Sequence, residues 1–323
     1  MDNSLLVVRD INHKYIVVDY NTLIRYRTIS ENNLNALKEN RLYYSTPANF
    51  NDPYDTLLYA DYGKIMQDVY GNLENGMDKY LLKLKNNKEI KNAPIIAGIG
   101  YAFWNGTKKD EFIDNFLGDV LEAASGIKIA LRKNVKIICF TEEHSSMLMW
   151  SHYADNHKGF ALIYDKDDIG NADNYMSDGT PIRKKPILKK VMYTEQQTDL
   201  TEELESYVRA YRMETLGDVK PPETNLSQDK LRNMILEKSP DWKYEKEWRV
   251  IPRHISLEQE SNLAYMKIKP KAVILGSMCS EADRRKLIDI CNKKRIPVFQ
   301  STLKFWEPGY KLSVSDLDES FKL

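Results

Sequence analysis

Two glutamates separated by one residue are the feature of this sequence that most directly suggests chemistry. Glu245 and Glu247 stand in the segment WKYEKEWR at residues 242–249. In an extended segment, side chains two residues apart share one face. When two carboxyls lie side by side, the charge of one raises the pKa of the other, and together they can stabilise a positive charge that develops in a substrate. The alternative is a solvated face of alternating Glu and Lys, but the flanking tryptophans argue against full exposure.

An arginine segment near the N-terminus is a second candidate. Residues 25–27 read Arg-Tyr-Arg at the predicted end of a strand, and YYSTP follows at residues 43–47. A guanidinium on a strand edge can bind phosphate or carboxylate with two hydrogen bonds, and tyrosine rings offer flat apolar faces. For this segment alone, a surface arginine beside a half-buried aromatic strand is the favoured interpretation.

The segment FNDPYD at residues 50–55 predicts a rigid turn. Asn51 and Asp52 precede a proline, and such side chains accept hydrogen bonds from the backbone of a turn. We expect these residues to cap the start of a helix. Orientation of a ligand or of the arginine is the alternative role.

A third candidate site follows a predicted strand at residues 135–140. The polar segment CFTEEHSS at residues 139–146 is followed by the aromatic segment MWSHYAD at 149–155. Together the two segments suggest a surface that binds a ligand. The alternative is that Trp150 and Tyr153 belong to the core. A metal site would use Glu142, His144, His152, Asp155 and His157. Because His152 and His157 are five residues apart and do not share a helical face, we predict no metal.

Composition excludes several classes of protein. Among 323 residues, Lys plus Arg number 47 and Asp plus Glu number 47, so no net charge attracts nucleic acid or an acidic membrane. The three cysteines have neither the pairing of a disulfide framework nor zinc-ligand spacing. The sequence shows no export signal or membrane-spanning segment, so we expect a cytoplasmic protein.

The elements that must position these residues are predicted from periodicity and capping. Strands are expected at residues 15–19, 22–28, 41–45, 135–140, 160–164, 248–251, 272–275 and 298–302. Helices are expected at 30–40, capped by Ser30, at 145–154, capped by Ser145, and at 200–213, 226–236 and 281–294. We predict one α+β domain over residues 1–323, in which N-terminal and C-terminal segments form a small split β-sheet. Helical insertions are expected at about 56–131 and 195–238.

Four motifs in order resemble a bacterial family of uncharacterised proteins, a domain of unknown function. The motifs are Tyr26-Arg27, LYYS through FNDPYD at residues 42–55, MWSHYAD at 149–155 with Lys158-Gly159, and YEKEWR at 244–249. The resemblance runs from about residue 22 to the C-terminal strands and leaves the two helical stretches unmatched. This family implies no activity.

The same segments are more distantly similar to diphtheria-toxin-like ADP-ribosyltransferases. That similarity matches Arg27 to a first-strand residue, residues 137–141 with the following helix to a second motif, and Glu247 to the catalytic second glutamate of Glu-x-Glu. The stretch between Arg27 and Thr141 is longer than in compact transferases, and Cys139 stands where several relatives have Tyr. The second-motif role therefore falls to Ser45, Thr46 or Thr141.

The resemblance implies roles for individual residues. Glu247 would stabilise the oxocarbenium-like transition state that forms when the nicotinamide C–N bond breaks, and Glu245 would orient the acceptor or act as its base. Arg27 would hold NAD, the substrate, by charge-assisted hydrogen bonds. The remaining residues expected to bind NAD are Ser45, Thr46, Asn51, Asp52, Thr141, Trp150, His152 and Tyr153, with the Trp150 and Tyr153 rings clamping the nicotinamide.

We therefore expect an enzyme that transfers ADP-ribose from NAD to a protein, RNA or DNA, as a bacterial toxin or anti-phage effector. A toxin role implies an antitoxin or inhibitor protein as a partner. Three alternatives remain open at this point. They are an NAD glycohydrolase, a metal-dependent nuclease or hydrolase, and a non-catalytic sensor or adaptor domain.

Overall fold

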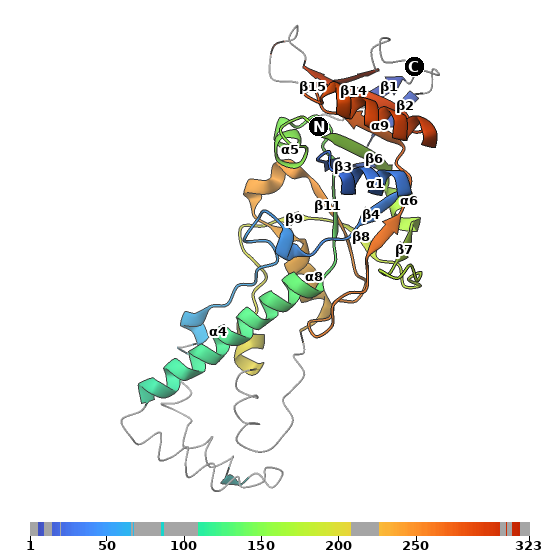
Figure 1. Cartoon of the computed structure of the whole chain (residues 1–323). Coiled ribbons are helices and arrows are strands. Elements are labelled where there is room, and N and C mark those ends of the chain that lie inside the picture. The colour runs from blue at the N-terminus through green and yellow to red at the C-terminus, as the bar shows by residue number, and fades with distance from the viewer. Residues whose placement is uncertain are drawn as a thin grey trace. The chain divides into compact units, whose positions relative to one another are not determined.

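The computed structural model describes residues 6–9, 15–19, 21–65, 67, 85–86, 109–207, 226–303, 308 and 312–316. The chain divides into two compact units, which we call unit 1 and unit 2 (Figure 1). Unit 1 comprises Met1–Asn51, Asn134–Tyr193 and Lys238–Leu323, and unit 2 comprises Asp52–Lys133 and Thr194–Glu237. The two segments of unit 2 fall at the positions of the predicted insertions, about 56–131 and 195–238.

The described part of unit 1 is built on an eight-stranded mixed sheet in the order β15-β14-β13-β6-β3-β5-β11-β8. All neighbouring strands are antiparallel except β13 and β14, which are parallel. The strands are β3 (Thr22–Arg27), β5 (Ile138–Thr141), β6 (Phe160–Asp165), β8 (Ile187–Lys190), β11 (Glu247–Ile251), β13 (Ala272–Leu275), β14 (Val298–Leu303) and β15 (Leu312–Asp316). The predicted α+β class is confirmed, and the sheet is larger than the small one expected.

Three strands that carry candidate motifs, β3, β5 and β11, are consecutive neighbours in this sheet. β3 follows from a β-branched and aromatic run, and β5 and β11 from short apolar runs with polar ends. Ile24 of β3 pairs with Thr141 of β5, and Thr141 pairs with Glu247 of β11. Residues directly opposite one another across strands point to the same face. Ile24, Thr141 and Glu247 therefore form one row on one face.

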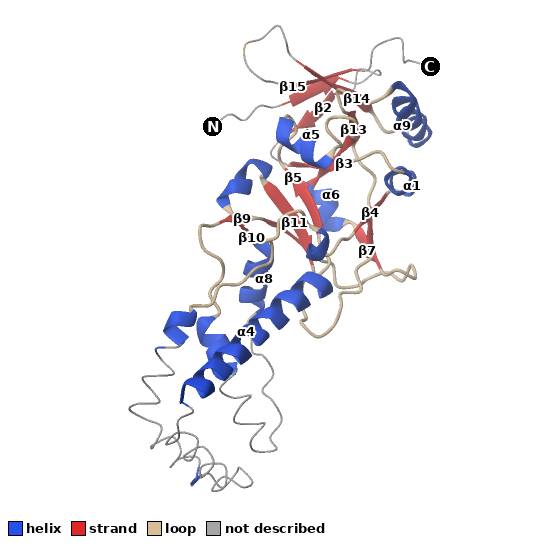
Figure 2. Ribbon diagram, turned by 60° about the vertical axis from the view of Figure 1, so that its left-hand side comes forward, coloured by secondary structure: helices blue, strands red, loops and turns tan. Residues whose placement is uncertain are grey.

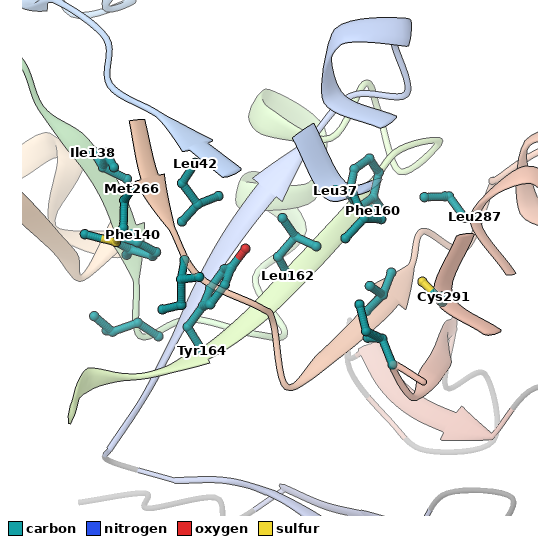
Figure 3. Packing of buried hydrophobic residues seen from close by; sticks show 14 of the residues in the cluster. Leu37, Leu42, Ile138, Phe140, Phe160, Leu162, Tyr164, Met266, Leu287 and Cys291 are labelled. Carbon is teal, nitrogen blue, oxygen red and sulfur yellow. The ribbon is translucent and has the colours of Figure 1, made fainter. Parts of the chain in front are cut away.

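Each face of the sheet carries its own apolar cluster. One cluster holds Leu23, Phe160, Leu162 and Tyr164 together with Leu37 of α1 (Glu31–Glu39). Figure 3 shows this cluster, in which side chains from β6, α1 and α9 (Glu281–Lys294) meet. We call this side of the sheet the α1 face, and α1 and α9 lie beside each other on it (Figure 2).

The opposite side, which we call the α5 face, is covered by α5 (Met147–Tyr153). Met149 and Trp150 of this helix pack with Ile24 and Tyr26 of β3. The alternation of Leu23 and Ile24 between the two clusters is the period of two that a strand buried on both faces requires.

Capping side chains explain where the helices begin. Ser30 Oγ accepts a hydrogen bond from Asn33 N at 3.3 Å, as predicted, and α1 ends at Asn40, which has the left-handed φ of 55°. The α5 helix is capped by Ser146 rather than by Ser145, because the Ser146 hydroxyl accepts from Met149 N at 3.3 Å. α9 occupies the predicted residues 281–294.

Shorter elements complete the described part of unit 1. A three-stranded sheet has the order β4-β12-β7, and β1 pairs with β2. The bounds are β1 (Leu6–Arg9), β2 (Tyr15–Val18), β4 (Arg41–Tyr43), β7 (Asp173–Tyr175), β9 (Met192–Tyr193), β12 (Tyr265–Lys267), α6 (Lys166–Asn171), and the 3-10 helices η1 (Pro47–Asn49) and η2 (Pro240–Glu245).

Unit 2 is mostly helical where it is described, with turns at residues 53–56 and an isolated bridge between Tyr59 and Asp199. It contains most of α4 (Lys109–Asn134) and all of α8 (Gln228–Leu236), and β10 (Glu237–Lys238) spans its boundary with unit 1. Residues 201–207 are helical, and the rest of the helix predicted at 200–213 lies outside the described residues. Of the helices in the described residues, none has the length and apolar character needed to span a membrane.

Candidate functional site

Four charged side chains are buried together on the α5 face: Lys238, Glu245, Glu247 and Arg249. Each is less than one-tenth exposed. Lys238 Nζ donates to Glu245 Oε2 at 2.6 Å and lies 3.3 Å from Glu247 Oε2. Arg249 donates two hydrogen bonds to the Glu247 carboxylate, from Nε to Oε1 at 2.8 Å and from Nη2 to Oε2 at 3.0 Å. We call these four residues the buried charge cluster.

The backbone brings the two glutamates to one lysine by a turn, not along one strand. Ser239 and Pro240 start η2, which ends at Glu245, and Lys246 has a left-handed φ of 44°. Glu247 is the first residue of β11. The prediction that Glu245 and Glu247 share one face of an extended segment is therefore wrong, because a 3-10 helix precedes the strand.

The pKa values of the two carboxyls are shifted in opposite directions. Burial would raise the pKa of Glu247, but Arg249 and Lys238 outweigh it and lower the pKa to about 2. Burial raises the pKa of Glu245, and Lys238 offsets that effect only in part. Titratable pairs pushed apart in this way are typical of residues that divide acid and base roles.

A chain of hydrogen bonds leads from the buried charge cluster to the surface. Tyr153 OH donates to Glu245 Oε1 at 2.6 Å, and Asn51 Nδ2 donates to Tyr153 OH at 3.2 Å. Tyr153 is half-buried and Asn51 is exposed. On a second side, Glu247 N donates to Tyr193 OH at 2.9 Å. The structure thus brings together Glu245, Glu247, Tyr153 and Asn51 from the predicted site.

Thr141 also belongs to this site, but through the backbone. Its hydroxyl donates to the carbonyl oxygen of Glu245 and accepts from Glu143 N at 2.8 Å. Thr141 is buried and lies opposite Glu247 in the sheet. Its contacts hold the segment that carries Glu245. Two positions earlier, burial raises the pKa of the Cys139 thiol, which keeps it neutral.

Aromatic rings cover the two cations of the cluster. The Arg249 guanidinium lies 5.4 Å from the centroid of Phe50, and the Lys238 ammonium lies 4.5 Å from that of Trp242. Lys238 and Arg249 were not predicted as site residues. Arg249 could have been found from the period of two, which places it on the face of Glu247. Nothing in the sequence marked Lys238 as a site residue, because it was the last residue of a predicted helical insertion.

Arg27 does not join the buried charge cluster. It pairs with Phe160, a residue of the α1 face, and is three positions from Ile24, which lies in the row of Glu247. An odd separation along a strand reverses the face. Arg27 therefore points to the α1 face, and Glu247 points to the α5 face. The sheet separates the residue expected to hold NAD from the residue expected to act on it.

Trp150 is part of the core. It is 0% exposed and packs edge-on against Tyr26, with ring centroids 4.9 Å apart. Burial leaves this ring no free face to clamp nicotinamide. His152 is exposed, and its ring lies 6.3 Å from Tyr153 and 6.4 Å from Tyr244. Of the two rings expected to form the clamp, only Tyr153 keeps an accessible surface.

The remaining predicted binding residues serve local structure. Ser45 bridges to Ile137 through backbone hydrogen bonds of 2.8 and 2.9 Å. Thr46 Oγ1 accepts from Asn49 Nδ2 at 3.2 Å, within η1. In unit 2, Asp52 Oδ1 accepts from Tyr54 N at 2.8 Å, which confirms the rigid turn, although a turn and no helix follows it.

The residues proposed for a metal site are occupied elsewhere or separated. Glu142 accepts hydrogen bonds from Lys166, Lys190 and the Trp248 indole at 3.2, 2.9 and 2.9 Å. These contacts lower its pKa against the opposing effect of burial. Within the described residues, no group of three or more His, Cys, Asp or Glu side chains could hold a metal ion.

Comparison with known proteins gives one match. Residues 149–250 match a family model described as a protein of unknown function (DUF2971). No curated protein sequence and no solved structure matches the chain. The matched range includes α5 from Met149 onward, β6 and the whole buried charge cluster. Over that range the chain is similar to a family of uncharacterised proteins.

Proposed function

We propose that the protein transfers ADP-ribose from NAD to a macromolecular acceptor, with Glu245 and Glu247 as the reacting pair. One observation carries the proposal: the two carboxyls at the start of β11 share Lys238 and have oppositely shifted pKa values. The adjacency of β5 and β11 supports it further, because the resemblance assigns its second and third motifs to these strands and Thr141 lies opposite Glu247. Arg27 of β3 lies on the other face of the sheet and has no part in this site.

Glu247 would supply the negative charge. Breaking the bond between nicotinamide and ribose builds positive charge on the sugar, and a fixed anion stabilises that charge more in the transition state than in the substrate. With a pKa of about 2, Glu247 is ionised at any physiological pH. The fork of Arg249 fixes its orientation, at the cost of partly neutralising its field.

Glu245 would take the proton. As a nucleophilic oxygen or nitrogen of the acceptor bonds to the sugar carbon, the C–N bond breaks and its electron pair leaves with nicotinamide. The proton of the acceptor group passes to Glu245, whose raised pKa favours proton uptake. Tyr153 and Asn51 connect Glu245 to the surface, so the acceptor would approach from their side.

The test follows both products of the reaction. The purified protein is mixed with NAD labelled on its adenylate in a bacterial lysate, and nicotinamide release and label in the protein and nucleic-acid fractions are measured. Variants Glu245→Gln and Glu247→Gln are compared with Glu258→Gln, a change at an exposed carboxylate. We expect wild type and Glu258→Gln to transfer label and Glu245→Gln to lose at least a hundredfold in rate.

The outcomes separate the alternatives. Nicotinamide release without label transfer would identify an NAD glycohydrolase. No release with any acceptor fraction would reject NAD as the substrate. A role as a toxin or anti-phage effector, with an antitoxin or inhibitor partner, is part of the same proposal. It predicts that expression of wild type, but not of Glu245→Gln, arrests bacterial growth.

A further inference from the structure

Two arginines on the α1 face have no carboxylate against them in the described part of the chain. Arg25 is 7% exposed, its Nη1 donates to the Cys139 carbonyl at 2.8 Å, and its guanidinium lies 5.7 Å from the Phe140 centroid. Arg27, two residues further along β3 on the same face, is half-buried and makes no hydrogen bond or ion pair with a described residue.

This arrangement is costly without a counter-charge. Burial lowers the pKa of Arg25 and of Arg27, and the charge of Arg25 lowers that of Arg27 further. The titratable groups whose charges would act on the two guanidiniums are Tyr44, Tyr164 and, through the sheet, Cys139, and burial raises the pKa of each, so all three are neutral. The protein supplies hydrogen-bond donors and positive charge here without a matching acceptor.

Arg27 lines a pocket on the α1 face, between the end of β3, α1 and β4. The lining includes a second guanidinium, that of Arg41, and the side chains of Asn33 and Tyr43, with Leu162 and Ile268 as apolar walls. Arg41 is already held in place, because it pairs with Glu39 at 2.9 Å and lies 4.4 Å from the Tyr265 centroid. The pocket thus contains the guanidinium of Arg27, which has no partner among the described residues, beside that of Arg41, which Glu39 holds in place.

We propose that this pocket binds the phosphate group of a small phosphorylated ligand, with Arg27 as the main contact. The guanidiniums of Arg27 and Arg41 line the pocket, and Glu39 pairs with Arg41. Arg25 lies outside the lining, but its charge acts on Arg27, so the three guanidiniums outnumber the carboxylate of Glu39 by two. A phosphate monoester carries close to two negative charges at pH 7 and accepts paired hydrogen bonds from a guanidinium. The apolar walls would contact the organic part of the ligand.

This site is separate from the buried charge cluster, because the sheet lies between them. The proposal therefore does not depend on NAD chemistry, and its test measures binding alone.

In the test, the whole protein is titrated with inorganic phosphate. Binding is measured by calorimetry, and the change in melting temperature is measured by thermal unfolding. Sodium chloride at matched ionic strength controls for screening, and acetate tests a carboxylate in place of phosphate. The variants are Arg27→Met, which removes the charge, Arg27→Lys, which keeps the charge without the fork, and Arg41→Gln. Arg183→Met is the matched control at an exposed arginine.

We expect phosphate to bind wild type and Arg183→Met saturably and to raise their melting temperature beyond the effect of chloride. Arg27→Met should bind at least tenfold more weakly, with Arg27→Lys and Arg41→Gln intermediate. Should Arg27→Met fail to fold, the losses in Arg27→Lys and Arg41→Gln decide the question.

Three results would overturn the proposal. They are a phosphate effect no larger than that of chloride, equal phosphate affinity in wild type, Arg27→Lys and Arg41→Gln, and a response to acetate but not to phosphate.

Discussion

The ammonium group of Lys238 lies 2.6 Å from one oxygen of Glu245, and both side chains are only 4% exposed. The same ammonium reaches Glu247 at 3.3 Å, so one cation serves two buried carboxylates. Arg249 provides Glu247 with a second partner, whereas Lys238 is the only cation that contacts Glu245 among the described residues. Removing this lysine should therefore affect Glu245 most.

Replacing Lys238 by Met should destabilise unit 1 by about 3 kcal/mol, because it leaves a buried carboxylate without its cation. The free energy of unfolding is measured in urea, with Lys184→Met at an exposed position as control. The double variant with Glu245→Gln should recover part of the loss, since the unpaired charge is then absent. A loss below about 1 kcal/mol would show that the pair is solvated.

Acid should weaken the protein through Glu247. Its pKa is lowered from 4.5 to about 2 in the folded protein, so the stability that it contributes is fully present above pH 4.5. This contribution decreases as the pH falls below 4.5, because the carboxyl of the unfolded chain binds a proton first, and it is lost as the pH falls through about 2, where the carboxyl becomes protonated in both states. Unfolding measured from pH 6 to pH 2 should show a steeper loss in wild type than in Glu247→Gln. If stability falls equally with pH in wild type and in Glu247→Gln, then the acid sensitivity arises from groups other than Glu247.

Replacing Tyr153 by Phe should raise the pKa of Glu245 further. The lost hydroxyl donates to this carboxylate at 2.6 Å, and a charge-assisted hydrogen bond of this kind contributes about 2 kcal/mol. The titration of Glu245, followed by carbon NMR, should move to higher pH. Tyr54→Phe, at a residue 66% exposed, is the control. An unchanged titration would mean that Tyr153 does not hold the carboxylate in solution.

Gly159 should tolerate no side chain. A Cβ atom at this position would lie 2.1 Å from the Arg27 carbonyl oxygen and 2.9 Å from that of Ala154, and both are backbone atoms. Gly159→Ala should therefore cost about 3 kcal/mol or prevent folding. Gly170→Ala in α6, with nothing within 4 Å of its Cβ, should instead stabilise by up to about 1 kcal/mol. Equal thermal stability of the two variants would contradict this packing.

Elements with strong local signals were predicted well. The bounds of α9 were predicted without error, and α1 was predicted with its cap at Ser30, because serine caps and helical spacing act within a few residues. The strand β3 was found from its β-branched and aromatic residues.

The site was predicted only in part, because its geometry depends on distant parts of the chain. Glu245, Glu247 and Tyr153 do meet, but Lys238 gave no signal, since a lone lysine after a predicted helix has the same local pattern whether buried or exposed. The separation of Arg27 from Glu247 follows from cross-strand register, and a one-residue change of register reverses every face. Sequence spacing alone cannot supply that register.

The order of strands in unit 1 also has a consequence for synthesis. β3 leaves the ribosome early, yet its neighbours β5 and β6 come more than 100 residues later, and Tyr26 OH reaches the Glu143 carbonyl across 117 positions. Contacts of such long range form slowly, because a large loop must close first. β11, which carries Glu247, is made later still. Nascent chains that end before β11 therefore hold an unpaired edge of β5 and no assembled charge cluster, which exposes them to chaperones and proteases until β11 is added.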